Sequence, residues 1–351
     1  MMVSETIMRI IIYNSYTLSK EGNLMKAARK VIHLFVIVLS LGALLAMAAC
    51  GAQTAAPPAS AGQTADSPEA NAPDTRKYTD YKGNEVQIPV QPQRVIFAGE
   101  TFGDLLVLGV DAVGAQLSSI KDHVFENRVK SIEDVGFPIN LEKVLELKPD
   151  LILVASTDTK QYEQLSKVAP TVMFDTFAPL DERIAVLGDL LGKQQKAKQW
   201  LADFNAKAEA MWKQLRADGM KDGETASVFT YYPGDRLFVM ARAGLPQMLY
   251  HPNGFKPTPM IQDVLNGSKG FMHISPELLP QYAGDRIFIL IPAAGLEDAR
   301  KSTDELMKSR IWLDLPAVKN GRVYSIDISK SDSDASTREW MLEELPRMLR
   351  K

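Results

Sequence analysis

The sequence contains a single cysteine, Cys50, and only four histidines among 351 residues. One cysteine has no internal partner, which excludes a disulfide-stabilised scaffold. A site for a free transition-metal ion needs three or four His, Asp, Glu or Cys ligands that converge. Downstream of Cys50 the only histidines are His123, His251 and His273, which are widely spaced. Binding of a free metal ion is therefore disfavoured, and we expect no metal site.

The sequence also lacks the short motifs that carry common enzyme chemistry. It has no GxSxG elbow, no P-loop and no HExxH, and GETFGD (99–104) is not a dinucleotide-binding fingerprint. We therefore expect no enzymatic activity, with a hydrolase of unrecognised site as the alternative. The formal net charge is −3, without the basic excess that nucleic-acid binding requires.

The N-terminal 49 residues have the layout of a secretory signal. A basic cluster, Lys26 to Lys30, precedes the largely apolar run 31–49, and small residues lead into Cys50. Either Met1 or Met25 is the true start. AMAAC (46–50) resembles the lipobox of bacterial lipoproteins, although Met47 replaces the usual leucine. This resemblance implies lipidation of Cys50 and attachment to a membrane; a retained anchor helix is the alternative.

Residues 51–75 contain no Val, Ile, Leu, Met or aromatic residue. Such a segment has nothing with which to build a core, so we expect residues 50–75 to be a lipidated cysteine followed by a disordered tether. The folded part then begins near Arg76.

From Arg76 onward, strand and helix signals alternate. KYTDYKGNEVQIPV (77–90) predicts a hairpin turning at 82–84. Short apolar runs predict buried strands at 94–99, 112–116, 151–155 and 171–174. Helical spacing predicts helices at 101–109, 140–148, 161–170 and 181–192. This alternation is typical of a largely parallel sheet covered by helices on both faces.

A long helix interrupts this pattern at residues 193–218. Its apolar residues recur at three- to four-residue spacing: Trp200, Leu201, Phe204, Ala208, Met211, Trp212 and Leu215. Strand signals then resume at 226–232, 236–241, 286–292 and 322–327, and Ser336 and Thr337 open a last helix. We therefore predict an α/β fold of two three-layer lobes joined by one long rigid helix, which should limit hinge opening. The expected bounds are 76–192 for the first lobe, 193–218 for the helix and 219–351 for the second lobe.

Each predicted lobe carries a glutamate at the same place in a short helix. Glu142 lies two residues after the expected N-cap Asn140, and Glu277 lies two residues after the expected N-cap Ser275. A carboxylate in a first turn stabilises a helix through its dipole, which explains either residue taken singly. As a matched pair on two lobes, they favour an external contact.

Several segments resemble substrate-binding proteins of ABC importers for ferric siderophores, haem and cobalamin. The resemblance is carried by NLEKVLELKPDLILVAS (140–156), ISPELL (274–279), YEQLSKVAPTVMFD (162–175) and LPAVKNGRVYSID (315–327). It implies a class III periplasmic-binding-protein-like fold without a cofactor, a ligand held between the lobes, and one glutamate on each lobe that docks onto arginines of a permease dimer. Glu142 and Glu277 match those positions.

Ligand contacts are expected from loops at the carboxyl ends of strands. These loops are 99–104, 116–123, 156–162, 231–236, 240–244 and 328–334. Arginine offers planar donors and tyrosine a flat face with a hydroxyl to an oxygen-rich ferric chelate. The candidate residues are Tyr231, Tyr232, Arg236, Arg242, Lys121 and Lys330. Asp332 and Asp334 are interpreted as solvated loop residues.

Together these features predict a monomeric, lipid-anchored, extracytoplasmic binding protein that delivers an Fe(III)-siderophore to an ABC permease. A hydroxamate siderophore is favoured because the cleft loops show no compact cluster of basic residues for a triply charged catecholate. Cobalamin, haem or a free metal ion are the alternatives.

Overall fold

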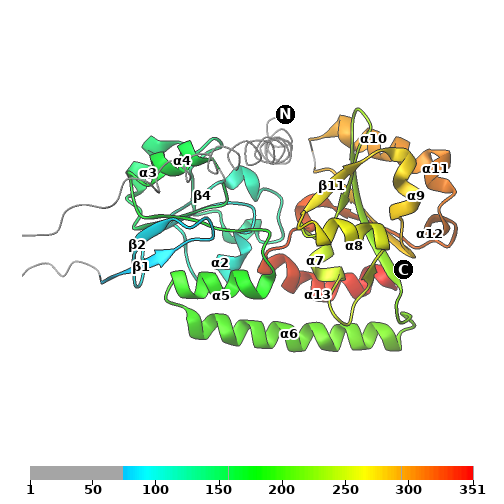
Figure 1. Cartoon of the computed structure of the whole chain (residues 1–351), viewed down its shortest axis with the longest axis horizontal. Coiled ribbons are helices and arrows are strands. Elements are labelled where there is room, and N and C mark those ends of the chain that lie inside the picture. The colour runs from blue at the N-terminus through cyan, green and yellow to red at the C-terminus, as the bar shows by residue number, and fades with distance from the viewer. Residues whose placement is uncertain (1–73, 157, 294, 351) are drawn as a thin grey trace, which may run out of the picture. The chain divides into compact units, whose positions relative to one another are not determined.

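The computed structural model describes residues 74–156, 158–293 and 295–350 (Figure 1). The predicted signal peptide, the lipidation site Cys50 and the predicted tether up to residue 73 lie outside these ranges. The described residues belong to one compact unit of tertiary contacts, so the predicted lobe boundaries stay predictions. In these ranges, no helix combines the length and apolar character needed to cross a bilayer.

The first lobe is built on a five-stranded parallel sheet in the order β5-β4-β3-β6-β7. Its strands are β3 (Val95–Ala98), β4 (Gly114–Ala115), β5 (Glu133–Asp134), β6 (Leu151–Val154) and β7 (Thr171–Met173). Every residue of β3, β6 and β7 is buried, because helices cover both faces of a parallel sheet. These runs match the strands expected from the sequence.

Helices and a separate hairpin complete the first lobe. The helices are α2 (Gly103–Val107), α3 (Leu141–Leu147), α4 (Thr159–Leu165) and α5 (Leu180–Leu190), with 3₁₀ turns η2 (Leu117–Ser119) and η3 (Glu126–Arg128). The predicted hairpin is confirmed as the antiparallel pair β1 (Thr75–Thr79) and β2 (Glu85–Pro89). Helix α3 begins as predicted, because the Asn140 side chain accepts hydrogen bonds from two backbone N–H groups, those of Glu142 and Lys143.

The second lobe has a mixed sheet in the order β11-β9-β8-β12-β13, with β10 also pairing β8. Its strands are β8 (Thr225–Tyr232), β9 (Arg236–Met240), β10 (Lys256–Pro257), β11 (Phe271–Ile274), β12 (Arg286–Ile291) and β13 (Val323–Asp327). Strand β9 runs antiparallel to both β8 and β11. Strands β8 and β9 are antiparallel because the three-residue link between Tyr232 and Arg236 makes a hairpin rather than a crossover.

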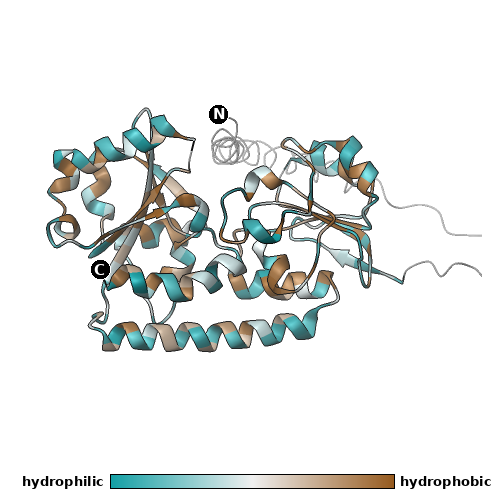
Figure 2. Cartoon of the chain, turned by 180° about the vertical axis from the view of Figure 1, so that it is seen from behind, coloured by the Kyte–Doolittle hydropathy of each residue, from teal (hydrophilic) through white to brown (hydrophobic). Residues whose placement is uncertain are grey.

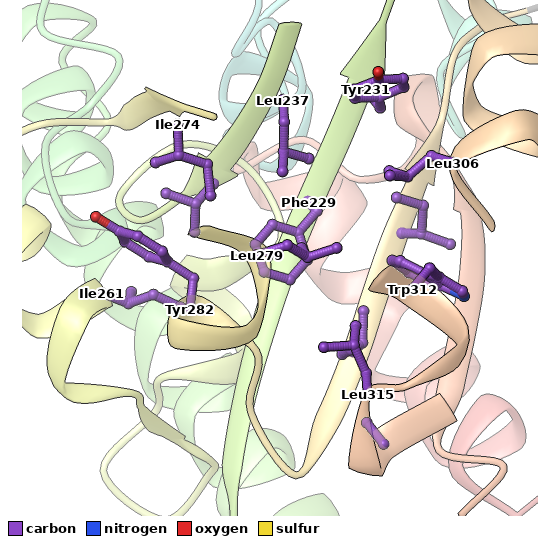
Figure 3. Close-up of a cluster of buried hydrophobic side chains, with 14 of the residues drawn as sticks. Phe229, Tyr231, Leu237, Ile261, Ile274, Leu279, Tyr282, Leu306, Trp312 and Leu315 are labelled. Atoms are coloured by element: carbon purple, nitrogen blue, oxygen red, sulfur yellow. The ribbon is translucent and has the colours of Figure 1, made fainter. Parts of the chain in front are cut away.

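Helices surround this second sheet and close the chain. They are α7 (Pro246–Leu249), α8 (Pro259–Asn266), α9 (Leu279–Tyr282), α10 (Glu297–Lys308), α11 (Arg310–Leu313), α12 (Pro316–Lys319) and α13 (Ala335–Leu349), with 3₁₀ turns η4 (Pro276–Leu278) and η5 (Ile328–Lys330). Figure 3 shows the core beneath α8, α9 and α11, where side chains of β8 and β9 such as Phe229 and Leu237 meet Leu279 and Trp312.

The long helix α6 (Gln194–Ala217) confirms the predicted 193–218 helix within two residues. Its buried residues are Ala197, Phe204, Ala208, Met211, Trp212 and Leu215. It packs against α5 of the first lobe and against α13. Figure 2 shows that the strands of both sheets are largely hydrophobic and that hydrophilic and hydrophobic residues alternate along α6. One helix thus spans the chain's two sheets and joins them.

Two predicted helix starts differ in detail. Helix α13 is capped by Asp334, whose carboxylate accepts from the Thr337 N–H at 2.9 Å; Ser336 and Thr337 lie inside the helix. Ser275 occupies the N-cap position of η4 but makes no side-chain cap; its hydroxyl instead bonds the carboxylate of Glu277. The predicted short helix is a 3₁₀ turn that continues into α9.

Candidate ligand-binding cleft

A buried ion pair joins the first lobe to the C-terminal helix. Asp104 in α2 and Arg183 in α5 lie 2.9 Å apart, and both side chains are completely buried. The other carboxylate oxygen of Asp104 accepts from the Ala335 N–H at 2.7 Å, and Arg183 donates to the Ser333 carbonyl at 2.5 Å. This pair and its two backbone contacts, called the floor below, therefore link the first lobe to the start of α13.

The packing at this floor is close. Ser336 Oγ donates to the Gly103 carbonyl at 2.9 Å, and the carboxylate of Asp334 lies where a side chain at Gly103 would have to go. Asp334 has no solvent exposure, so the interpretation of it as a solvated loop residue was wrong. Burial, followed by the nearby Asp104 carboxylate, raises the pKa of Asp334 to about 6.

Beside the floor, the loops that follow β4 and β13 meet. His123 Nε2 lies 3.0 Å from the carboxylate of Asp332, and Ser329 Oγ donates to the Asp122 carbonyl at 3.2 Å. Asp332 was also expected to be solvated, but its side chain is only 28% exposed and pairs with His123. Burial lowers the pKa of His123, yet the facing carboxylates of Asp332, Asp334 and Glu100 outweigh it, so this pKa lies above its ordinary value.

A cavity of about 460 Å³ opens between these loops. Its volume falls in the range of small-molecule sites, roughly 300–1,000 Å³. Its lining residues come from both sides: Asp122, His123, Val124, Glu126 and Asn127 from the first lobe, and Asp327, Ser329, Lys330 and Trp340 from the segment that begins at the end of β13. The first-lobe lining follows β4 and most of the second-lobe lining follows β13, as expected for open α/β sheets. The predicted loops 116–123 and 328–334 are thus brought together.

A second inter-lobe contact involves Arg242. Its guanidinium lies 3.4 Å from the Phe177 carbonyl of the first lobe. The ring of Phe177 lies so close to Gly270 that a Cβ there would come within 3.1 Å of it. Arg242 is therefore at the junction of the lobes, as its selection as a ligand residue requires, but it does not line the cavity described above.

The other candidate ligand residues lie in different surroundings. Lys330 is exposed and lines the cavity, whereas Lys121 is exposed beside it and is not part of the lining. Tyr231 packs in the core cluster of the second lobe, as Figure 3 shows, and its hydroxyl donates to Asp235 at 2.7 Å. Tyr232 is buried on the other face of β8, with the guanidinium of Arg236 5.9 Å from its ring centroid.

The loop after β7 was not among the ligand loops predicted from the sequence. In this loop Thr176 Oγ1 donates to Glu100 at 2.6 Å, and Phe177 contacts the second lobe. Burial raises the pKa of the Glu100 carboxyl, although this hydrogen bond acts against it. This loop also lies at the carboxyl end of a predicted strand (171–174) of the same sheet, so the criterion used for the other loops would have identified it.

The described residues contain no group of three or more His, Cys, Asp or Glu side chains placed to hold a metal ion. Glu142 and Glu277, the two glutamates predicted to dock, are both exposed on short helical elements. They are not part of the cavity lining. The charged side chains that line the cavity and the two surface glutamates therefore lie at different places on the protein.

Known proteins share this architecture. The chain is 35% identical over 280 residues to the iron(3+)-hydroxamate-binding protein YxeB of Bacillus subtilis (strain 168), covering 77% of this chain and 83% of that protein. It is 33% identical over 316 residues to the iron(3+)-hydroxamate-binding protein FhuD of the same organism, covering 87% and 94%. The crystal structure of Staphylococcus aureus SirA complexed with staphyloferrin B aligns with a TM-score of 0.69 at 28% identity, covering 79% of this chain and 99% of that one.

The periplasmic binding protein family matches residues 100–329, which include the second sheet, the first sheet apart from β3, and the cavity loops up to Ser329. The predicted fold class of two α/β lobes is confirmed by these structural neighbours. Two lobes, a connecting helix and an inter-lobe cavity are the parts that a solute receptor needs. This chain belongs to the periplasmic binding protein family.

Proposed function

We propose that this protein captures a ferric siderophore of the hydroxamate class between its lobes and delivers it to an ABC permease. The observation that carries the proposal is the cavity of about 460 Å³, which is lined by side chains from both sides of the lobe junction. The relatives named as iron(3+)-hydroxamate-binding proteins supply the ligand class.

The cavity chemistry fits a neutral, oxygen-rich chelate. Its lining includes the carboxylates of Asp122, Glu126 and Asp327 and one lysine, Lys330. A ferric trihydroxamate core carries no net charge, whereas a ferric tris-catecholate carries about three negative charges that this lining would repel. Arg242 lies at the lobe junction, outside the lining of this cavity, and would offer planar donors to a chelate that extends toward it.

No enzymatic activity is assigned, because the family binds substrates and releases them unchanged. Anchoring through lipidated Cys50, an extracytoplasmic location and a monomeric state are part of the proposal. A Cys50→Ala variant should leave the membrane fraction and appear in the medium or periplasm. Continued membrane retention of that variant would favour an anchor helix.

The proposed function is tested by titrating the protein with ferrioxamine B, a ferric catecholate, haem and cobalamin, and with metal-free siderophores as controls. Saturable sub-micromolar binding of ferrioxamine B alone supports it. Preferential binding of the catecholate, haem or cobalamin would replace the hydroxamate assignment, and binding of none would overturn it.

A further inference from the structure

The side chain of Gln247 contacts elements of both lobes. Gln247 lies in α7, which follows the loop that carries Arg242. Its side-chain N–H donates to the Arg242 carbonyl at 2.5 Å, and its side-chain oxygen accepts from Arg338 of α13. The same oxygen lies 3.5 Å from Nη1 of Arg183, which belongs to the first lobe. The amide of Gln247 therefore connects the Arg242 loop to α13 and to the floor.

The groups around position 247 require a donor and an acceptor on the same side chain. Two guanidinium groups, those of Arg183 and Arg338, face the side-chain oxygen and require an acceptor. The Arg242 carbonyl faces the side-chain nitrogen and requires a donor. Among side chains of this length, an amide supplies both, whereas a carboxylate offers acceptors alone. A glutamate would therefore satisfy the two arginines but would repel the Arg242 carbonyl.

The loop that carries Arg242 is also held from a second side. The three N–H groups of residues 241–243 all donate to the Gly270 carbonyl, at 2.8, 2.9 and 3.0 Å. The backbone of Arg242 is thus fixed through its N–H by Gly270 and through its carbonyl by Gln247. Its guanidinium is less restrained, since the contact with the Phe177 carbonyl is 3.4 Å long and Arg242 is half-buried. The guanidinium can therefore turn toward a ligand while the backbone stays in place.

Arg338 adds further contacts between α7 and α13, which lie next to each other (Figure 1). Arg338 is buried, and its guanidinium also donates to the backbone carbonyl of Gln247 at 3.3 Å and to the Ser333 carbonyl at 2.8 Å. The Ser333 carbonyl is the one that accepts from Arg183 in the floor. Gln247 therefore lies where α5, α7 and α13 meet.

We propose that Gln247 is a positioning residue, which fixes the Arg242 loop against the first lobe so that the Arg242 guanidinium faces a ligand bound between the lobes. This inference rests on the proposed function, which supplies the ferric hydroxamate. A guanidinium forms directional hydrogen bonds with a chelate, and the residues behind it supply the restraint that this geometry needs. Loss of the amide donor should therefore weaken ligand binding without weakening the fold.

The test separates the two contacts of the Gln247 amide. Gln247→Glu keeps an acceptor for the two arginines but removes the donor to the Arg242 carbonyl, and Gln247→Met removes both. Gln262→Glu makes the same substitution at an exposed position of α8 and is the matched control. On the full chain, calorimetry measures affinity for ferrioxamine B, urea denaturation measures stability, and hydrogen exchange measures protection of the amides of residues 241–243.

We expect Gln247→Glu to bind ferrioxamine B at least about tenfold more weakly, with faster exchange of the 241–243 amides. Its unfolding midpoint should equal or exceed that of the parent protein, because a carboxylate pairs with both guanidinium groups. Ferrioxamine B carries a pendant ammonium, so direct attraction by the new carboxylate would act in the opposite direction. Gln247→Met should lose both affinity and stability, and Gln262→Glu should bind within about twofold of the parent protein.

An Arg242→Gln background shows whether Gln247 acts through Arg242. In that background Gln247→Glu should change affinity by less than about twofold, because the guanidinium that it positions is absent. Three results would overturn the inference: parent-like affinity of Gln247→Glu, an undiminished loss in the Arg242→Gln background, or an equal loss in Gln262→Glu. Failure of the parent protein to bind ferrioxamine B would instead overturn the ligand assignment, and hydrogen exchange would then decide whether Gln247 fixes the loop.

Discussion

Asp104 and Arg183 form a completely buried ion pair, and each also bonds the backbone at the start of the C-terminal segment. Both residues belong to the first lobe, so separation of the lobes would break the bonds of this pair to the Ser333 carbonyl and the Ala335 N–H and leave those buried groups without partners. We therefore expect ligand to enter the inter-lobe cavity with only a small movement between the lobes.

Breaking this pair should destabilise the protein strongly. Asp104→Asn leaves the buried Arg183 guanidinium without its counter-charge, which costs about 3–5 kcal/mol in comparable pairs. Lys77→Gln, which removes the exposed pair between Lys77 and Glu85, should change stability by at most about 1 kcal/mol. Urea denaturation of both variants measures the difference. Equal effects would show that the floor pair has no special structural role.

The close approach of Asp334 to Gly103 predicts a second structural effect. The Cβ of Gly103→Ala would clash with the Asp334 carboxylate, and this overpacking should lower the free energy of unfolding by about 1–3 kcal/mol. Gly267→Ala is the control, because its added Cβ meets nothing closer than 3.4 Å. Thermal unfolding compares the two. A neutral Gly103→Ala would mean that the lobes are not held as closely as described.

The contact between His123 and Asp332 predicts that stability depends on pH. The pKa of His123 in the folded protein lies above its ordinary value of 6.5. The contribution of the pair to the free energy of unfolding is therefore complete below pH 6.5 and is lost as pH rises through the folded-state pKa. Asp334, raised from 3.8 to about 6, acts in the same direction, and its contribution is lost as pH rises toward 6. His123→Gln should therefore flatten the decline in unfolding midpoint above pH 6.5 while leaving the decline below pH 6 in place. An unchanged decline above pH 6.5 in that variant would contradict the assignment.

The shared floor and α6 together predict a small domain movement. Solution scattering of the protein with and without ferrioxamine B should give nearly equal radii of gyration. A large compaction on ligand addition would be incompatible with a floor that stays paired.

The docking glutamates give a prediction about transport. Glu142→Arg/Glu277→Arg reverses both exposed charges and should abolish uptake of the ferric hydroxamate, because electrostatic complementarity governs orientation and association rate. Ligand binding should be unaffected, since neither residue lines the cavity. Normal uptake by this variant, or loss of binding, would count against docking through these residues.

Local features of the fold were predictable from the sequence because their causes are local. The apolar runs of β3 and β6, the Asn140 cap and the apolar stripe of α6 each depend on neighbours within one element. The mixed sheet of the second lobe was harder to predict, because a short link between strands had to be recognised as a hairpin.

The site was predictable as a set of loops but not as a set of contacts. Asp332 and Asp334 look like solvated residues in KSDSDAS, and only residues more than 200 positions away, such as His123 and Asp104, explain their burial. The two-residue period of a strand likewise does not tell which of Tyr231 and Tyr232 faces the core. Such outcomes depend on long-range packing rather than on local pattern.

The most direct test of the account is where the chelate binds. Trp340 lines the cavity, whereas Trp312 lies in the core of the second lobe. Titration with ferrioxamine B should quench tryptophan fluorescence saturably, and Trp340→Phe should remove the largest share of that quenching while calorimetry still detects saturable binding. Trp312→Phe should retain it. Quenching that does not depend on Trp340, or the absence of saturable binding, would contradict an inter-lobe ferric hydroxamate site.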